Sequence, residues 1–407
     1  MAKSGYDYDA IIVGAGPAGS TMARLLAQAG KDILVVDKRK DIGSPVRCGE
    51  GLGEREVIAQ GLELPKEVIS TDIHGAKVIA PNGKSIVWKD KNTSGWVLER
   101  KMFDKWLAEL AVHKGAEIHS YTRAIDLVKK EGKIDGVILE KYGKDPYEVR
   151  APLVVSAEGM EAQLARKAGF KTVHSLYDVD TCYQYEMQEY DHENLIELYF
   201  GTEAAPRGYV WIFPKKGKKA NVGIGIGGNL STNKKNSGIM GADPKAYLEK
   251  FIANHPTLKN ASTLLDFGGI ISVGAPLDKF VENNFMVVGT AAKQVDPIHG
   301  GGIALAMEAA VMAAKVAEEA IEKNDFSKER LFAYEKAWRA GPGKKVEKRL
   351  MLRKVLEHTS DDDLNHIFNC ITRQDLDLVM QGKFAGPVAK VVAGRPQLVG
   401  ILKGLIS

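Results

Sequence analysis

DAIIVGAGPAGSTMARLLAQAGKDILVVD, residues 9–37, is the stretch that decides the fold of this chain. The segment from Tyr8 to Gly30 predicts a buried strand, a tight glycine turn and then a helix, because an apolar run is followed by glycines and by helix-forming residues. Asp32 to Asp37 reads as the next strand. The order strand, turn, helix, strand predicts a βαβ unit with a parallel sheet.

The glycine turn matches a phosphate-binding pattern. Gly14-Ala15-Gly16-Pro17-Ala18-Gly19 has the spacing G-x-G-x-x-G between the predicted strand and helix. Glycines there permit the sharp turn and let backbone N–H groups approach a pyrophosphate at the positive end of the helix. Asp37 ends the second strand, where an acidic side chain hydrogen-bonds a ribose hydroxyl. The sequence therefore predicts dinucleotide binding by Gly14, Gly16, Ala18, Gly19 and Asp37.

Length and composition place the chain among folded proteins that can enclose a large cofactor. It has 407 residues, of which 44% are hydrophobic and 27% charged, enough for two domains. No stretch approaches the ~20 apolar residues that a membrane span needs, and the polar start, residues 1–9, lacks the features of a signal peptide. Three separated cysteines fit a reducing compartment. We expect a cytoplasmic protein with no metal site and no nucleic-acid partner.

Further elements are predicted from periodicity. Apolar residues gather on one side of a helix from Arg100 to about Lys114, and residues 117–123 read as a strand. From Thr181 to Gly228 the pattern alternates and contains aromatic residues, which indicates an antiparallel sheet. A long helix is expected from Ile303 to about Lys323. Beyond Phe326 the chain reads as helical, with breaks at 341–343 and 386–387.

Two segments outside the glycine turn indicate a flavin. Residues 100–104, RKMFD, resemble the Arg-x-x-Phe-Asp helix start of flavin enzymes of the hydroxylase superfamily, whose arginine lies against the cofactor. Residues 287–303, with Gly300-Gly301-Gly302-Ile303 opening a helix, resemble the superfamily's segment that reaches the ribityl, phosphate and ring groups. A helix N-terminus at the ring stabilises the negative charge of the reduced flavin. FAD is therefore the expected cofactor, and the further residues that the resemblance assigns to it are Cys48, Gly49, Gly51, Arg100, Ala124, Thr290, Gly302 and Ile303.

The chain departs from the superfamily pattern at two positions. Thr290 stands where the aspartate of a Gly-Asp pair is usual, so it can hydrogen-bond but brings no charge. Glu158 stands where Ala-Asp-Gly is usual, in Ser156-Ala157-Glu158-Gly159. For Glu158, a structural carboxylate that braces the glycine loop and a functional carboxylate are both open.

A narrower resemblance rests on two motifs. Residues 206–214, PRGYVWIFP, resemble the Pro-x-x-Tyr-x-Trp-x-Phe-Pro stretch of geranylgeranyl reductases, and residues 45–52, PVRCGEGL, resemble their cysteine-containing loop. With the flavin motifs these segments cover most of the first 310 residues. The resemblance implies FAD-dependent saturation of the isolated double bonds of geranylgeranyl chains on archaeal membrane-lipid precursors.

The residues themselves offer a substrate wall and several proton donors. Alternation places Tyr209, Trp211 and Phe213 on one face of a strand, where they form either an aromatic wall for a long apolar chain or ordinary sheet core. Reduction of an unactivated alkene needs a hydride at one carbon and a proton at the other. The proton could come from Cys48, Tyr209, His299 or water, and these three residues are the candidate catalytic groups.

The fold class that follows is α/β, with a Rossmann-type FAD-binding domain, an interleaved antiparallel-sheet substrate domain and a C-terminal helical cap. We assign residues 1–75, 97–170 and 275–325 to the first, 76–96 and 171–274 to the second, and 326–407 to the third. The glycine run Gly223 to Gly228 lies in a strand-like alternation, so we interpret it as sheet glycines rather than a second nucleotide loop.

Two rival functions and several partners stay open at this level. An FAD-dependent monooxygenase of an aromatic substrate shares the Arg100 and Gly289 regions, and a non-catalytic prenyl-chain-binding protein shares the fold. The electron donor could be ferredoxin, a reduced deazaflavin or NAD(P)H. Lysine clusters at 215–219 and 344–349 read as solvated faces, or as sites for anionic lipid or an acidic protein. We expect peripheral contact with the inner face of the cell membrane, where the apolar tail, 399–406, could serve.

Overall fold

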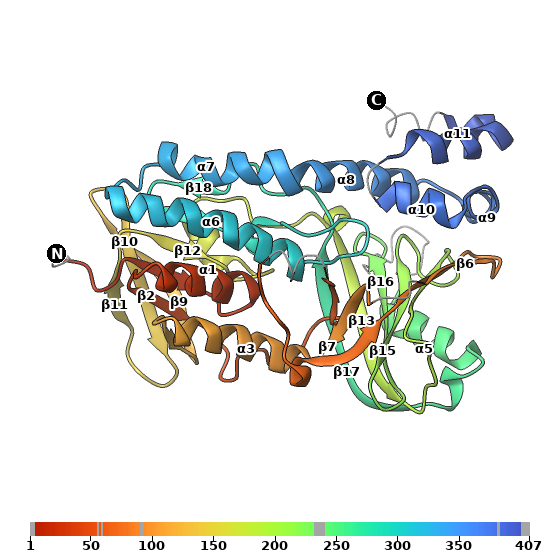
Figure 1. Ribbon diagram of the computed structural model, residues 1–407, viewed down its shortest axis with the longest axis horizontal. Coiled ribbons are helices and arrows are strands. Elements are labelled where there is room, and N and C mark those ends of the chain that lie inside the picture. The colour runs from red at the N-terminus through yellow and green to blue at the C-terminus, as the bar shows by residue number, and fades with distance from the viewer. Residues whose placement is uncertain are drawn as a thin grey trace.

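The stretch that opens the chain builds the centre of a six-stranded sheet in the computed structural model (Figure 1), which describes residues 5–54, 57, 60–89, 93–231, 241–380 and 383–399. Its strand order is β18-β19-β12-β1-β2-β8. These strands are β1 (Ala10–Val13), β2 (Ile33–Val36), β8 (Glu117–His119), β12 (Val154–Ser156), β18 (Val281–Glu282) and β19 (Phe285–Val287). All pairs are parallel except β18 with β19. The Rossmann-type βαβ unit is thus confirmed.

Helices and a second sheet pack against this parallel sheet and share one hydrophobic core with it. The helices α1 (Pro17–Gln28), α3 (Arg100–His113), α6 (Ile303–Lys323) and α7 (Lys328–Trp338) pack in sequence, α1 against both α3 and α6, and α6 against α7. An antiparallel sheet of β9 (Thr122–Lys130), β10 (Lys133–Lys141) and β11 (Tyr147–Arg150) shares the same hydrophobic core. The buried face of α6 consists largely of alanines, which lets it approach α1 closely.

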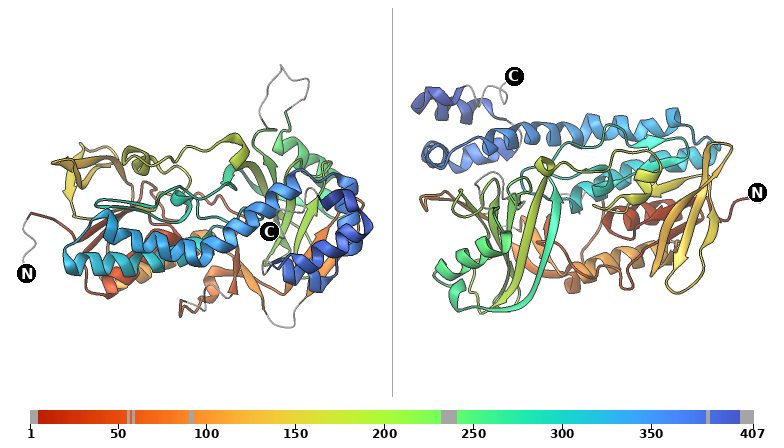
Figure 2. Two further views of the ribbon diagram at one scale, coloured as in Figure 1. Left: turned by 90° about the horizontal axis from the view of Figure 1, so that it is seen from above. Right: turned by 180° about the vertical axis from the view of Figure 1, so that it is seen from behind.

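A seven-stranded sheet forms the other half of the molecule (Figure 2). Its order is β17-β13-β16-β15-β14-β5-β6. The strands are β5 (Gly75–Ile79), β6 (Ser85–Lys89), β13 (Val179–Gln188), β14 (Ile196–Phe200), β15 (Tyr209–Lys215), β16 (Lys219–Gly227) and β17 (Ser262–Ser272). The helix α5 (Pro244–Asn254) packs on β13 and β16 and closes a hydrophobic core on one face. The opposite face is directed toward the parallel-sheet half.

Short segments join the two halves. A three-stranded sheet of β3 (Gly51–Gly53), β7 (Gly95–Leu98) and β4 (Ile69–Ile73) lies between them, and its core includes side chains from α3 and α6. Short helical turns complete the connections: η1 (Lys66–Val68), η2 (Leu176–Asp178), η3 (Leu258–Asn260), η4 (Gly289–Ala292), η6 (Pro396–Leu398) and the five-residue α4 (Gln163–Lys167). The division into three domains at the residue limits given above stays our proposal.

The C-terminal region is helical, as the sequence indicated. Between α7 and α8 (Lys344–Glu357) the chain passes through a π-helical turn, Arg339–Gly343, that is kinked at Gly341, so the break predicted at 341–343 is present as a kink. The wider turn accommodates Pro342, which lacks an N–H donor, while Gly341 takes non-helical backbone angles. The remaining helices are α9 (Asp361–Cys370), α10 (Arg373–Met380) and α11 (Ala385–Gly394).

Two smaller differences concern element limits. The single strand predicted over 117–123 is two strands, β8 and the start of β9, because Tyr121 adopts a left-handed φ of 56° between them. The helices α3 and α6 agree with the predicted limits to within one residue. The described part of the apolar tail is Val399, which is exposed, and the rest of that tail lies outside the described residues. Among the helices described, none combines the length and apolar character needed to cross a bilayer.

Candidate active site

The three glycines of the phosphate loop occupy different environments. A Cβ on Gly14, whose φ is 109°, would lie 2.3 Å from the Ala157 carbonyl oxygen, and a Cβ on Gly19 would lie 1.8 Å from the Gly14 carbonyl oxygen. A Cβ on Gly16 would meet nothing within 4 Å. Gly14 and Gly19 are therefore required by packing, whereas Gly16 borders open space. The helix α1 starts beside it with no side-chain cap and no acidic residue in its first turn, so its free N–H groups fit a pyrophosphate.

Asp37 lies at the carboxyl end of β2 and holds this loop. Its carboxylate accepts hydrogen bonds from the Ala15 N–H at 2.9 Å and from the Arg39 N–H at 2.8 Å, and it is buried. Ala124 lies on β9 just beyond Thr122, whose N–H donates to the Asp37 carbonyl. Both residues thus lie at the end of the sheet where the nucleotide would sit. Their contacts with FAD stay predictions.

The second flavin segment brings η4 next to the start of α6. Thr290 lies in η4, and its Oγ1 would be 3.3 Å from a Cβ on Gly302. Gly302 is the N-cap of α6, which begins at Ile303 with no side-chain cap and no acidic residue in its first turn. The N-termini of α1 and α6 are thus both uncapped, and both suit the negative charges of a reduced FAD.

The loop before α6 is held by its own residues. The Asp296 carboxylate accepts the Ile298 N–H at 2.9 Å, lies 3.3 Å from Nε2 of His299 and pairs with Arg349 of α8. Burial raises the pKa of Asp296, but His299 and Arg349 outweigh burial and lower it below the ordinary value. His299 Nδ1 accepts the Gly301 N–H at 3.1 Å. The His299 ring is therefore folded against its own loop, and Arg349 is an internal partner rather than part of a solvated basic patch.

Glu158 has a structural role. Its carboxylate accepts hydrogen bonds from Ser156 Oγ at 2.6 Å and from the N–H groups of Leu164 and Ala165 at 2.9 and 3.1 Å. The carboxylate therefore caps the N-terminus of α4 and ties it to the end of β12. These contacts favour the structural interpretation of Glu158.

The aromatic residues of β15 share the face directed toward the FAD-binding half. Tyr209 donates its hydroxyl to the His299 carbonyl at 2.7 Å, and burial raises the pKa of Tyr209 above its ordinary value. Trp211 is 6% exposed and donates its indole N–H to Gln184 Oε1 at 2.9 Å. Neighbouring rings along the strand lie 5.8 Å (Tyr209 to Trp211) and 6.5 Å (Trp211 to Phe213) apart. The three rings form a continuous strip, as their alternation predicted.

Phe213 connects this strip to the cysteine loop. A Cβ on either Gly49 or Gly51 would lie 3.0 Å from Cε2 of Phe213, so the glycines allow the loop to rest on the ring. The glycine run that begins at Gly223 lies in β16, which ends at Gly227. This confirms the interpretation of the run as sheet glycines. Gly223 lies opposite Trp211 in the ladder, and a Cβ there would meet the indole at 2.3 Å.

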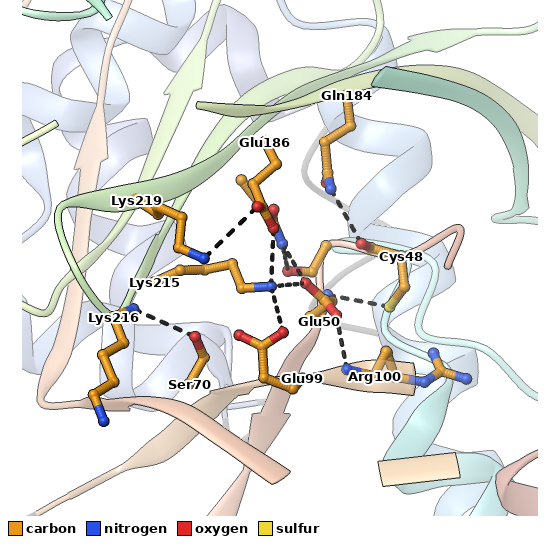
Figure 3. Close-up of polar contacts among 12 residues, drawn as sticks. Cys48, Glu50, Ser70, Glu99, Arg100, Gln184, Glu186, Lys215, Lys216 and Lys219 are labelled. Atoms are coloured by element: carbon orange, nitrogen blue, oxygen red, sulfur yellow. Dashed lines mark hydrogen bonds and ion pairs between the residues drawn. The ribbon is translucent and has the colours of Figure 1, made fainter. Parts of the chain in front are cut away.

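Cys48 lies in the loop that follows the cis peptide bond between Ser44 and Pro45. Its Sγ accepts the Glu50 N–H at 3.2 Å, and its carbonyl accepts Nε2 of Gln184 at 3.2 Å (Figure 3). Arg100, at the start of α3, forms a bidentate pair with Asp104 at 2.8 and 3.0 Å. Burial opposes the charge of Arg100, but Asp104 and Cys48 together raise its pKa above the ordinary value. Arg100 and Cys48 are therefore neighbours, and their contacts with FAD stay predictions.

A buried charge cluster adjoins the loop, and the sequence did not reveal it. Lys215 ends β15 and is 2% exposed, with its Nζ 2.8 Å from Glu50, 3.2 Å from Glu99 and 3.2 Å from Glu186 (Figure 3). The interpretation of residues 215–219 as a solvated face is therefore wrong for Lys215. The alternation that grouped Tyr209, Trp211 and Phe213 also places Lys215 on their face, which was the one available signal.

Comparisons with known proteins agree with this geometry. Residues 9–190 match the model of the FAD dependent oxidoreductase family, and residues 178–271 match that of the geranylgeranyl reductase catalytic domain. The second match spans β13 to β17 and so covers the face that carries the aromatic strip.

Two curated relatives of similar length have the same name. The chain is 40% identical to the digeranylgeranylglycerophospholipid reductase of Methanosarcina acetivorans over 88% of this chain and 87% of that one. It is 36% identical to that of Methanocaldococcus jannaschii over 98% of both. A solved geranylgeranyl bacteriochlorophyll reductase-like protein of Thermoplasma acidophilum superposes with a TM-score of 0.88 at 35% identity, covering 98% of this chain and 99% of that one. A flavin-dependent brominase at 18% identity and a TM-score of 0.71 shares the fold alone.

Proposed function

The chain belongs to the geranylgeranyl reductase family, and from that membership we propose its function as a digeranylgeranylglycerophospholipid reductase. It is an FAD-dependent oxidoreductase that saturates the isolated double bonds of geranylgeranyl chains on archaeal membrane ether-lipid precursors. The monooxygenase and the non-catalytic prenyl-binding protein are not favoured by these relatives.

The position of the aromatic strip supports the proposal. The aromatic strip of β15 meets the FAD-binding half at both ends, at His299 through Tyr209 and at the cysteine loop through Phe213. A long apolar chain lying on this strip would be shielded from water beside the loops assigned to FAD, and burial of each CH₂ would contribute about 0.8 kcal/mol. Reduced FAD would supply the hydride. The residues of the chain would hold the alkene, exclude water and deliver the proton.

For the proton we favour Cys48 among the three candidates. The Tyr209 hydroxyl is committed to the His299 carbonyl, and its raised pKa makes it a weaker acid. The His299 ring bonds within its own loop through both nitrogens. The Sγ of Cys48 accepts the Glu50 N–H and lies next to Arg100. We therefore propose Cys48 as proton donor.

The electron donor and membrane contact are finer proposals. Within the part of the chain that the structure describes, no second glycine turn joins a strand to a helix in the phosphate-binding pattern, so we propose that ferredoxin, a reduced deazaflavin or transient NAD(P)H delivers electrons without a second Rossmann site. We propose peripheral contact at the inner face of the membrane because the substrate is a membrane-lipid precursor.

Anaerobic single turnover tests the function. The purified flavoprotein is reduced with dithionite, mixed with geranylgeranyl phospholipid, and followed by flavin absorbance and by mass spectrometry of the lipid. We expect flavin reoxidation with a gain of two hydrogens per double bond. Reoxidation that needs oxygen and an aromatic compound, with an oxygen atom added to it, would instead establish a monooxygenase. A protein that is isolated without flavin would support the binding protein.

A further inference from the structure

The cysteine loop is held by side chains from three adjacent strands of the substrate sheet. Gln184 of β13 donates to the Cys48 carbonyl at 3.2 Å, and Asn221 of β16 donates to the Gly49 carbonyl at 3.2 Å. Lys215 of β15 binds the Glu50 carboxylate at 2.8 Å. Three consecutive loop residues are thus each tied to a different strand of one face, which by the strand register is the face that bears the aromatic strip.

Glu50 is the member of the loop with the most contacts. Its Oε2 accepts both Lys215 Nζ and, at 2.7 Å, Asn221 Nδ2, while its Oε1 accepts the N–H of Arg100 at 2.8 Å. The last of these bonds places a carboxylate at the first residue of α3, where it also interacts favourably with the helix dipole. One buried side chain therefore links the loop, the sheet and the helix that carries Arg100.

The backbone of Glu50 adopts a conformation that is unfavourable for a residue with a side chain. Glu50 has a φ of 75°, although glycines stand on either side of it. A left-handed conformation is unfavourable for a non-glycine residue, and glycine would avoid this cost. Observed strain of this kind points to a role for the side chain that offsets it.

Lys215 supplies the compensating charge. Burial lowers the pKa of Lys215, but Glu50, Glu99 and Glu186 together raise it above its ordinary value, so the ammonium stays charged. Because a buried carboxylate needs a charged partner, Glu50 can point inward only while Lys215 occupies the end of β15. The pair thus fixes the end of the aromatic strand relative to the loop that carries Cys48.

We propose that Glu50 and Lys215 are positioning residues of this enzyme: their buried ion pair sets where Cys48 lies relative to the aromatic strip and to Arg100. This proposal rests on the proposed function, since it presumes that Cys48 and the strip serve alkene reduction. It assigns no contact of Glu50 or Lys215 with substrate or FAD.

The test compares Glu50→Gln with Glu99→Gln in the flavin-loaded protein. Glu99 is a second carboxylate on Lys215, but it is half-buried, and among the described residues its carboxylate binds neither the loop nor Asn221, so Glu99→Gln is the matched control. Iodoacetamide labelling is read by peptide mass spectrometry as the ratio of Cys48 to Cys370, since Cys370 lies on the distant α9 and serves as internal standard. Single turnover with geranylgeranyl phospholipid gives the rate and the half-saturating lipid concentration.

We expect Glu50→Gln to raise the labelling of Cys48 about fivefold relative to Cys370, because a loosened loop opens more often. We expect the turnover rate to fall by about tenfold to a hundredfold, with the half-saturating lipid concentration nearly unchanged, because misplacement affects the chemical step. Glu99→Gln should leave the Cys48 to Cys370 labelling ratio and the turnover rate within about twofold of the parent.

Several outcomes would overturn the proposal. Unchanged Cys48 labelling and turnover in Glu50→Gln would do so, and so would equal effects of Glu50→Gln and Glu99→Gln, which would indicate a general charge effect on Lys215. If Glu50→Gln does not retain FAD, Asn221→Ala takes its place. It removes the bonds of Asn221 to the Gly49 carbonyl and to the Glu50 carboxylate but keeps the ion pair with Lys215, and it should shift labelling in the same direction by a smaller factor. Because labelling does not use lipid, a parent protein that fails to reduce lipid refutes the proposed function separately.

Discussion

The indole of Trp211 lies across Gly223 of the neighbouring strand, with Cε2 and Cζ2 each 2.3 Å from where a Cβ on that glycine would be. The ring is 6% exposed and is fixed at its other edge by its hydrogen bond to Gln184. A glycine at this point of β16 is therefore what allows the ring to lie flat on the sheet, and with it the central part of the strip.

Gly223→Ala should therefore displace Trp211. We expect the half-saturating lipid concentration to rise about tenfold and the free energy of unfolding to fall by about 1–3 kcal/mol, as for other overpacked sites. The matched control is Gly269→Ala on the edge strand β17, where a Cβ would meet nothing within 4 Å. Steady-state kinetics and denaturant titration measure both effects. Equal behaviour of the two variants would show that Trp211 does not depend on Gly223.

The phosphate loop gives a prediction that separates binding from folding. Gly16→Val places a side chain in the open space beside α1, so we expect FAD affinity to fall by at least about a hundredfold while the apoprotein keeps its melting temperature. Gly19→Val meets the Gly14 carbonyl at 1.8 Å and should instead destabilise the apoprotein. Flavin released on denaturation gives the occupancy, and calorimetry of the apoproteins gives the stability. Loss of apoprotein stability in Gly16→Val would contradict this assignment.

The assignment of the proton donor predicts an order of effects. Cys48→Ser should slow flavin reoxidation by lipid about a hundredfold, which is typical for loss of a general acid. Tyr209→Phe should slow it less than about threefold, because its hydroxyl is already bonded to the His299 carbonyl and burial raises its pKa. Stopped-flow absorbance under anaerobic conditions measures both rates. A larger effect of Tyr209→Phe would transfer the role from Cys48 to Tyr209.

Sequence alone predicted those features that depend on neighbours in the chain. The phosphate loop, the starts of α3 and α6 and the face shared by Tyr209 and Trp211 follow from local spacing, and each is present. The charge cluster could not be predicted, because Lys215 meets carboxylates from three distant segments and is followed in the sequence by the exposed Lys216 and Lys218. The break at 341–343 also follows from local residues, and it is present as a kink at Gly341, next to Pro342.

A second buried pair joins the C-terminal helices to the site. Arg353 of α8, 8% exposed, forms a bidentate pair with Asp180 of β13 at 2.7 and 3.2 Å and donates to the Pro297 carbonyl at 3.0 Å. Burial raises the pKa of Asp180 even though Arg353 lowers it. The carboxylate thus lies where an unpaired charge would be costly, directly beside the loop assigned to FAD.

Arg353→Met should therefore lower the free energy of unfolding by about 3–5 kcal/mol, because it removes the bidentate partner of the buried Asp180 carboxylate. The double variant Asp180→Asn/Arg353→Met should lose less than Arg353→Met alone. The exposed neighbour Lys354 provides the control, and Lys354→Met should change stability by less than about 0.5 kcal/mol. Urea titration of the flavin-loaded proteins measures all three. A double variant as unstable as the single one would mean that Arg353 acts by packing and not by charge.

His174, in the segment that enters β13, predicts a specific acid sensitivity. Burial, and to a smaller extent Lys293, lower the pKa of His174 from 6.5 to about 4, and its buried Nδ1 has no hydrogen-bond partner among the residues that the structure describes. Between these two values the unfolded chain binds a proton that the folded chain excludes. The contribution of neutral His174 is therefore fully present above about pH 6.5, is lost as pH falls toward 4, and changes no further below that.

His174→Phe should keep the ring and remove the titration. We expect the melting temperature of the parent protein to fall more steeply than that of His174→Phe between pH 6.5 and pH 4, with the two curves parallel above pH 7. Carboxylates titrate in the same window, so the difference between the curves, and not either curve alone, reports on His174. His113 is exposed on α3, and His113→Gln should follow the parent throughout. Curves that stay parallel down to pH 4 would show that His174 titrates alike in the folded and unfolded chain.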